Sequence, residues 1–385
     1  MTTESQLLIA LVRIAVTGNA VPLDLNVDWN AFLQLARMHK LSALAYDGLK
    51  KAGIDMELVP AEIAAALRKD CFWAISQNVQ MEALRGKLEA GLQQRNVRHI
   101  FLKGAVLKFD YPVSALRTMS DMDILVHIED YPAIDDLVKE LEGTLLPGDG
   151  NHRSFLFPGN LTIEFHPNLL HQDTPVGTGI NPGWQYAKPS ESCSMALTEE
   201  GFYLHHICHM AEHLAGPGIG IRFVLDVWVH QNLRKEPADR AFIEQELVRF
   251  GLLGLAQNVE ALAQHWFDGA ESTPLLEELG AYIISSGIYG TNKQAARSAL
   301  SMSGGSRSAA FWQRVFYSRQ EMEGRFPWLK GKPWLLPVGW CVRAFRVLTT
   351  RKRLLADWLK DTGEVSKEEA VRQGELLARF GIRWK

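Results

Sequence analysis

The residues best suited to chemistry are two aspartates one residue apart, in the run Asp121-Met-Asp-Ile-Leu-Val126. Side chains alternate between the two faces of a strand, so Asp121 and Asp123 point to one side and Met122, Ile124 and Val126 to the other. Hard divalent cations prefer oxygen ligands, and Mg²⁺ typically takes one or two carboxylates together with substrate phosphates. The spacing therefore predicts half of a metal site at the mouth of a strand.

Two neighbouring segments position this pair. Before it, the strand-like run His99-Ile-Phe-Leu-Lys103 stops at Gly104, and a helix-like segment and a loop follow. After it, two strand-like runs at 153–157 and 161–166 flank Pro158-Gly-Asn160, which is a turn signal. Thr162, Glu164 and His166 share one face of the second run. A third carboxylate, Glu164, is thus available near the aspartates.

These residues carry a resemblance. Lys103-Gly104 followed by Arg117-Thr-Met-Ser-Asp-Met-Asp-Ile-Leu-Val126 resembles the polymerase-β-like nucleotidyltransferase superfamily, and within it the bacterial family called uncharacterised nucleotidyltransferase. The superfamily pattern is a Gly after a strand, two acidic residues on the next strand and a third carboxylate on a later one. Two departures from the commonest version are the sixteen residues between Gly104 and Asp121 and the presence of Ala105 where Gly or Ser is usual.

The resemblance implies metal-dependent transfer of a nucleoside monophosphate from a nucleoside triphosphate to an acceptor hydroxyl, with release of pyrophosphate. It implies two Mg²⁺ (or Mn²⁺) ions as cofactors. The predicted catalytic and metal-binding residues are Asp121, Asp123 and Glu164. Gly104 would let the triphosphate approach closely, since no Cβ blocks it. The predicted nucleotide-binding residues are Lys103, Gly104, Arg117 and Ser120. The acceptor stays open between a small molecule, a peptide, a protein and an RNA.

Two alternatives come from other classes. One is a non-catalytic nucleotide-binding or partner-binding protein with the same fold, although such a protein has little reason to gather three carboxylates that repel each other. The other is a zinc metalloprotease, because His209-Met-Ala-Glu-His213 matches the H-x-x-E-H pattern. Histidines at i and i+4 share a helix face and could hold Zn²⁺, with Glu212 as general base.

The protease interpretation lacks a clear third ligand. Asp226 is one possible candidate. We therefore expect the cluster of His205, His206, His209 and His213 to be structural or substrate-facing, without zinc. Dependence on Mg²⁺ or Mn²⁺ would support transfer, tightly held Zn²⁺ the protease, and no metal the binding protein.

Length and composition indicate a globular chain of several units. It has 385 residues, 47% of them hydrophobic and 22% charged, enough for a sizeable core. We predict an α/β (α+β) fold, a small mixed-sheet nucleotidyltransferase core with N-terminal and C-terminal all-α additions. The predicted units are an N-terminal helical region (1–95), the nucleotidyltransferase-like α/β core (96–195), a helical domain (196–304) and a basic, aromatic-rich C-terminal segment (305–385).

Local signals place several elements. Pro60 favours a helix start, and the stripe Met81, Leu84, Leu88 and Leu92 predicts that this helix is buried along its second half. Residues 171–195, rich in Pro, Gly, Asn, Asp and Thr, predict a loop that connects two domains. The glycine-rich run 216–221 predicts a helix–helix turn, because it lacks the strand-to-helix context of a dinucleotide loop.

The cysteines and the apolar runs indicate the cellular compartment. The four cysteines are scattered without a Cys-x-x-Cys pair, which favours a reducing compartment. No basic segment precedes the apolar N-terminal run, so an amphipathic helix is expected there and not a signal peptide. No run reaches the roughly 18 apolar residues of a membrane span. We expect a cytoplasmic protein without a membrane span.

Charge is unevenly distributed. Residues 297–385 hold 18 Lys and Arg against 8 Asp and Glu, a net charge of +10, while the rest of the chain carries −13. A basic tail with interleaved aromatics could bind a polyanion such as nucleic acid. We favour packing across the acidic body, with burial of the tail's aromatics: Phe311, Trp312, Phe316, Phe326, Trp328, Trp334 and Trp340.

Overall fold

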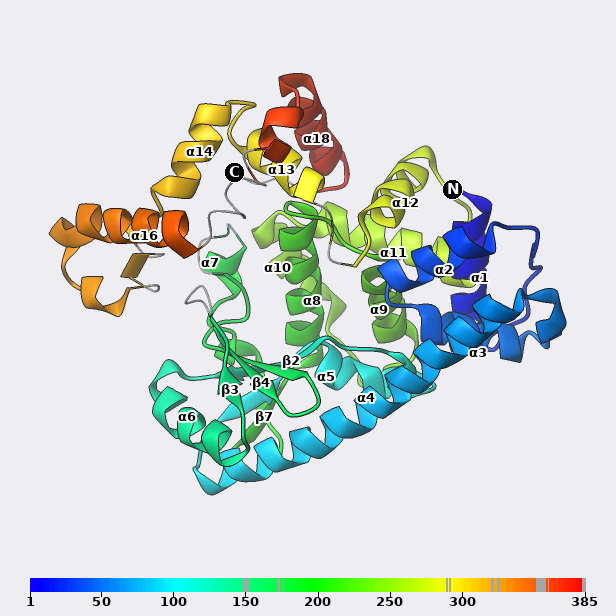
Figure 1. The fold of residues 1–385 in the computed structure, drawn as a ribbon, viewed down its shortest axis with the longest axis horizontal. Coiled ribbons are helices and arrows are strands. Elements are labelled where there is room, and N and C mark those ends of the chain that lie inside the picture. Colours follow the sequence, from blue (N-terminus) through cyan, green and yellow to red (C-terminus); the bar gives the residue numbers. More distant parts are fainter. Residues whose placement is uncertain are drawn as a thin grey trace.

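A mixed seven-stranded sheet lies at the centre of the computed structural model (Figure 1), which describes residues 1–382 apart from 148–151, 172, 173, 175, 289, 291, 320, 321, 324, 325, 351–357 and 359. The strand order is β3-β4-β5-β2-β1-β7-β6. The strands are β1 (His99–Phe101), β2 (Asp121–Val126), β3 (Thr144–Leu145), β4 (Arg153–Phe157), β5 (Leu161–His166), β6 (Ala187–Pro189) and β7 (Ser194–Leu197). The α/β fold with helical additions at both ends is confirmed.

Helices precede, interrupt and follow the sheet. Before it come α1 (Thr3–Thr17), α2 (Trp29–Met38), α3 (Ser42–Lys51) and α4 (Ala61–Gln94). Between strands lie α5 (Gly104–Leu107), α6 (Tyr131–Glu140) and α7 (Gly177–Ile180). After it come α8 (Glu199–Leu214), α9 (Ile221–Asn232), α10 (Arg240–Phe250), α11 (Leu253–Asp268), α12 (Pro274–Ser286), α13 (Asn292–Met302), α14 (Arg307–Val315), α16 (Leu336–Thr350) and α18 (Lys367–Arg379).

Side chains that alternate along β2 pack into two different hydrophobic clusters, one on each face of the sheet. Met122, Ile124 and Val126 pack in one cluster with α6 and with the second half of α4. Leu125, on the opposite face, packs in a larger cluster that joins helices from both ends of the chain. The sheet is therefore covered on both faces, and the first residue of β2, Asp121, is the one residue of that strand that is not buried.

Helix α4 connects the N-terminal helices to the sheet, as Figure 1 shows. It begins directly after Pro60, as predicted, because proline is tolerated where helix N–H groups have no partner. The predicted stripe is buried: Met81, Leu84, Leu88 and Leu92 all belong to the cluster under the sheet. The predicted hairpin is also confirmed, since β4 pairs antiparallel with β5 around the turn at 158–160.

The prediction of a plain loop over 171–195 is wrong. This stretch contains α7 and strand β6, and it leads into β7, which pairs parallel with β1 and extends the sheet. These strands are three and four residues long, too short for an alternating pattern to stand out among turn-forming residues. The glycine-rich run 216–221 does join two helices, α8 and α9, as predicted.

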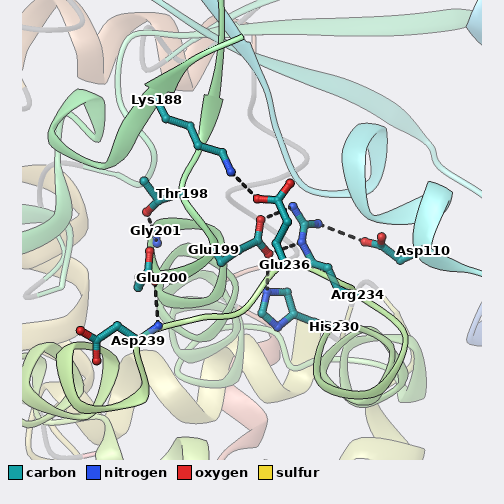
Figure 2. A network of polar contacts seen from close by, with 10 residues as sticks. All are labelled: Asp110, Lys188, Thr198, Glu199, Glu200, Gly201, His230, Arg234, Glu236 and Asp239. Carbon is teal, nitrogen blue, oxygen red and sulfur yellow. Dashed lines mark hydrogen bonds and ion pairs between the residues drawn. The ribbon is translucent and has the colours of Figure 1, made fainter.

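A polar network ties the helices after the sheet to the α/β core (Figure 2). The Arg234 guanidinium, beyond the end of α9, donates to both oxygens of Glu199 at the start of α8. It also donates to Asp110, which follows α5, over 3.0 Å. Both acids are at least partly buried, so this forked contact fixes the two helices against the segment between β1 and β2.

The C-terminal segment packs in two different ways. The end of α18 joins the main core through the buried Phe380 and Ile382, and Arg379 pairs with Glu278 at 2.6 Å. The expected burial of the tail's aromatics is wrong for four of the seven: Trp312, Phe316, Trp328 and Trp334 are exposed. Phe326 is buried, within a small separate cluster. Within the described residues, no helix has the length and apolar character needed to cross a bilayer.

Candidate active site

A cavity of about 1090 Å³ opens where β1, β2 and β5 meet the helices α8 and α9. All residues that the sequence predicted for metal and nucleotide binding line it: Lys103, Gly104, Arg117, Ser120, Asp121, Asp123 and Glu164. They come from segments up to sixty residues apart along the chain. The fold thus brings the predicted residues to one place, and their roles remain predictions.

Asp123 and Glu164 meet because β2 and β5 pair in parallel, whereas Asp121 is not part of the group of described residues whose ligand atoms lie close enough to hold a metal ion. In this register Asp121 lies opposite Thr162, and Asp123 opposite Glu164. Ligand atoms of Asp123, Glu164 and His166 all lie within 4.8 Å of one another, a spacing that could hold a metal ion. The i, i+2 alternation on both strands is what places these side chains on one face.

His166 lies between two of the carboxylates and contacts both. Its Nε2 lies 2.8 Å from Asp123 Oδ1 and 3.3 Å from Glu164 Oε2. Burial would lower the pKa of His166, but the two carboxylates outweigh it and raise the pKa above its usual value. The imidazole is therefore a hydrogen-bond donor to both acids.

Glu164 receives further donors from β4 and the residue before it. Ser154 Oγ donates to Glu164 Oε1 at 3.0 Å, and His152 Nε2 lies 3.4 Å from the same oxygen. Burial alone would raise the pKa of Glu164, yet hydrogen bonds from His152 and His166 hold it below the usual range. Glu164 is thus ionised and oriented.

The two aspartates differ in their surroundings. Burial would raise the pKa of Asp123, but Lys103 and His166 hold it well below the usual value. For Asp121, burial together with the Asp123 charge outweighs the charges of Lys103 and Arg222 and raises the pKa to about 6. Asp121 is therefore the carboxylate whose charge is least compensated, and a cation at this edge would stabilise its ionised form.

Lys103 points into the site and not into the sheet. Its Nζ lies 3.2 Å from Asp123 Oδ2, and its backbone has a φ of 48°, in the region that L-residues rarely adopt. Burial would lower the pKa of Lys103, but the surrounding carboxylates outweigh it and keep the amine charged. The turn at this residue aims the cation at the acids.

Gly104 and Arg117 are packed against each other. A Cβ on Gly104 would lie 1.9 Å from Arg117 Nη1, so this position requires glycine. Arg117 forms a forked ion pair with Asp226 of α9, at 2.6 and 3.2 Å, and Tyr111 donates to the same carboxylate at 2.6 Å. All three are buried. Arg117 holds the loop before β2 in place, and Asp226, the residue considered as a zinc ligand, is its partner.

The comparison with known families agrees with this geometry. A family model described as uncharacterised nucleotidyltransferase matches residues 26–268. The chain belongs to that family. No curated protein and no solved structure matches it. The match runs from just before α2 to the end of α11, so the matched region contains α8 and α9, which wall the cavity of this nucleotidyltransferase family member.

Helix α8 gives this family member a wall of histidines opposite the carboxylates. His206, His209 and His213 line the cavity, and the Nε2 atoms of His209 and His213 lie 3.1 Å apart. Burial lowers the pKa of His213 to about 4 and that of His209 well below its usual value, so both are neutral. Within the described residues, the cluster of three that could hold a metal is Asp123, Glu164 and His166, which the histidine pair does not join.

Among the cavity-lining residues that escaped the sequence analysis are His152, Arg222 and Lys330. Arg222, in the first turn of α9, donates to the backbone oxygen of Thr118 at 2.8 Å, and its charge lowers the pKa of Asp121. The signal that could have found it is the basic residue directly after the glycine-rich turn 216–221. His152 and Lys330 carry no comparable local signal.

Proposed function

We propose that the protein transfers a nucleoside monophosphate from a nucleoside triphosphate to an acceptor hydroxyl, using a divalent cation, Mg²⁺ or Mn²⁺. In this reaction the acceptor oxygen attacks the α-phosphorus, the bond between the α- and β-phosphates breaks, and pyrophosphate leaves. The observation that supports it most strongly is the β2–β5 register, which sets Asp123 beside Glu164 with Asp121 at the same edge. Membership in a nucleotidyltransferase family supports the reaction class.

The donor set suits a hard cation. Asp121, Asp123 and Glu164 offer carboxylate oxygens, which Mg²⁺ and Mn²⁺ prefer. His166 contacts two of these acids, and its imidazole nitrogen lies close enough to both to complete the metal-binding group. The under-compensated Asp121 leaves room for positive charge. When bound, the cation would neutralise charge on the phosphate oxygens and favour ionisation of the acceptor hydroxyl.

The triphosphate would lie between the carboxylates and two basic groups. Lys103 stays charged at the cavity wall, and Arg222 brings a guanidinium from the first turn of α9. Ser120, on the same cavity wall, would be a further donor, whereas the space beside Gly104 is filled by Arg117. Arg117 would act on this site by positioning the loop that carries it, because its guanidinium group is paired with Asp226.

The acceptor would enter from the side of α8. This wall carries neutral imidazoles and Glu212, whose pKa burial raises to about 7. Neutral imidazoles and a carboxyl that is half protonated near neutral pH can donate to and accept from hydroxyl groups. The wall therefore suits an uncharged, hydroxyl-bearing acceptor group better than a phosphate.

The direct test of transfer follows the label from an α-labelled nucleoside triphosphate into its product. Purified protein, Mg²⁺ and each α-labelled nucleoside triphosphate are incubated with a cell extract, and the label is traced into macromolecular and small-molecule fractions. Native protein should transfer label from at least one triphosphate, and Asp123→Asn should transfer none. The matched control is Asp136→Asn, which changes an exposed carboxylate on α6 and should behave as native.

Two outcomes would contradict the proposal. Equal label transfer by native protein and Asp123→Asn would place the chemistry elsewhere. Tight binding of Mg-triphosphate by calorimetry with no transfer into any fraction would favour the non-catalytic binding protein instead.

A further inference from the structure

Helix α16 exposes an apolar stripe. Val338, Cys341 and Phe345 follow one another at spacings of three and four residues, so they lie on one face of the helix. Trp334, in the short 3₁₀ helix η7 (Pro333–Leu335) that leads into α16, is 70% exposed, and all three stripe residues are exposed as well. A helix of a globular protein normally turns such a stripe toward the core.

The orientation of α16 is fixed by its other side. Trp340 Nε1 donates to the backbone oxygen of Tyr317 at 3.0 Å, and the Arg343 guanidinium lies 3.7 Å from the centre of the Tyr317 ring. Gly339 is buried, and a Cβ there would lie 2.8 Å from the Leu329 side chain. The helix thus has a packed side with its own small core, and its apolar stripe is the side turned outward.

Helix α14 packs against the other side of α16, through Trp340. Trp312 and Phe316 are about half exposed, and their rings stack at 5.2 Å. Phe316 in turn meets Trp340 of α16 at 4.9 Å, edge to face. Figure 1 shows α14 and α16 together at the periphery of the molecule, away from the sheet. We call the exposed side chains Trp334, Val338, Cys341 and Phe345 the peripheral apolar face.

The sequence around this face is basic, and two of its lysines are exposed. Residues 307–346 contain eight Arg and Lys against two Asp and Glu. Lys330 and Lys332 are exposed just before Trp334. Tryptophans with neighbouring basic residues are typical of membrane–water interfaces, where basic side chains meet anionic headgroups.

We propose that the peripheral apolar face binds the surface of an anionic lipid bilayer, with α16 lying in the plane of the interface. A bilayer accepts aliphatic and aromatic side chains together without a matching shape, and the basic flanks complement its charge. A single-stranded nucleic acid fits less well, because Val338 and Cys341 give its bases no ring on which to stack. This surface lies outside the family match, so the inference is independent of the proposed reaction.

The test is co-sedimentation of the full chain with vesicles of phosphatidylcholine and phosphatidylglycerol in a 7:3 ratio. Native protein should sediment with these vesicles, and binding should weaken in high salt and with phosphatidylcholine alone. The double variant Trp334→Ser/Val338→Ser should bind at least about 10-fold more weakly, because it removes two large apolar side chains from the face. Phe72→Ser/Trp73→Ser, which removes exposed residues of α4, is the matched control and should bind as native.

Charge is tested in the same assay by Lys332→Glu against Lys139→Glu, an exposed lysine on α6; only the first should weaken binding. Circular dichroism of each variant checks that the fold is retained. The proposal fails if native protein does not sediment with the anionic vesicles, or if the α4 control loses binding equally. It also fails if the Trp334/Val338 variant abolishes binding of single-stranded RNA, or dissociates a dimer of the chain, while vesicle binding stays unchanged.

Discussion

Asp123 and Glu164 lie side by side in the parallel pairing of β2 with β5, and the His166 imidazole contacts both carboxylates. Their other partners differ. Asp123 is also paired with Lys103 at 3.2 Å, whereas Glu164 accepts from Ser154 at 3.0 Å. Asp123 is thus linked to the proposed triphosphate side through the Lys103 ammonium group. Glu164 is anchored to β4 through Ser154. We expect them to contribute differently to binding and to transfer.

Asp123→Asn should weaken binding of Mg-triphosphate and abolish transfer together, since it removes a charged ligand from the centre of the site. Glu164→Gln should leave triphosphate binding within a few fold but lower transfer by about 100-fold, a transition-state loss of roughly 3 kcal/mol. Glutamine is nearly isosteric with glutamate, so packing should change little. Calorimetric titration of Mg-triphosphate beside the transfer assay measures both effects. Normal transfer by Glu164→Gln would show that the Glu164 carboxylate is not needed for the reaction.

Breaking the buried pair of Arg117 with Asp226 should destabilise the protein. Asp226→Asn leaves a buried guanidinium without its counter-charge, which typically costs about 3–5 kcal/mol. Glu278→Gln removes one partner of the half-exposed pair with Arg379 and should cost at most about 1 kcal/mol. Urea denaturation of both variants measures the difference. Similar midpoints for the two would show that the buried pair contributes no more than an exposed one.

The carboxylate edge could be predicted because its signals are local. Alternation along 121–126 and 161–166 fixes which side chains share a face, and the turn at 158–160 fixes the hairpin. The parallel pairing of β2 with β5 then brings their polar faces together, because its register sets Asp123 beside Glu164.

The rest of the cavity depends on long-range packing, which no local pattern records. Arg222 reaches the site because α9 docks against the loop at Thr118. The α8 histidines line the cavity because that helix packs against the sheet through the main core. The exposed aromatics of α14 and α16 have the same composition as buried ones, so the sequence alone could not show which way they face.

Substitution of Gly104 should perturb the site through Arg117. In Gly104→Ala the new methyl group would lie 1.9 Å from Arg117 Nη1, and Asp226 prevents the guanidinium from moving freely. We expect a loss of stability of about 1–3 kcal/mol, the usual range for overpacking. Gly86→Ala is the matched control, since nothing lies within 4 Å of that Cβ on α4, and it should gain roughly 0.5–1 kcal/mol. If urea denaturation shows Gly104→Ala to be as stable as native protein, the contact with Arg117 is not restrictive.

His39 should make the protein less stable in mild acid. The side chain is fully buried, accepts from the Ile221 N–H at Nδ1 over 3.1 Å and has its Nε2 3.1 Å from the Ile284 oxygen. This arrangement requires the neutral imidazole, and burial lowers the pKa of His39 to about 4. In the unfolded chain the group titrates near 6.5. Below that pH the unfolded state binds a proton that the folded state does not, so stability falls as the pH drops from about 6.5 toward 4.

Between pH 7.5 and pH 5 this single group should remove about 2 kcal/mol of stability. His205 and His213, whose pKa values burial lowers to about 3 and about 4, act in the same direction. The full effect on native protein should therefore be larger. In His39→Gln the non-titrating side chain should reduce the difference between the two pH values by about 2 kcal/mol, whatever the variant's stability at pH 7.5. Urea denaturation of both proteins at the two pH values gives this difference, and an unchanged pH dependence in His39→Gln would show that His39 keeps its ordinary pKa in the folded chain.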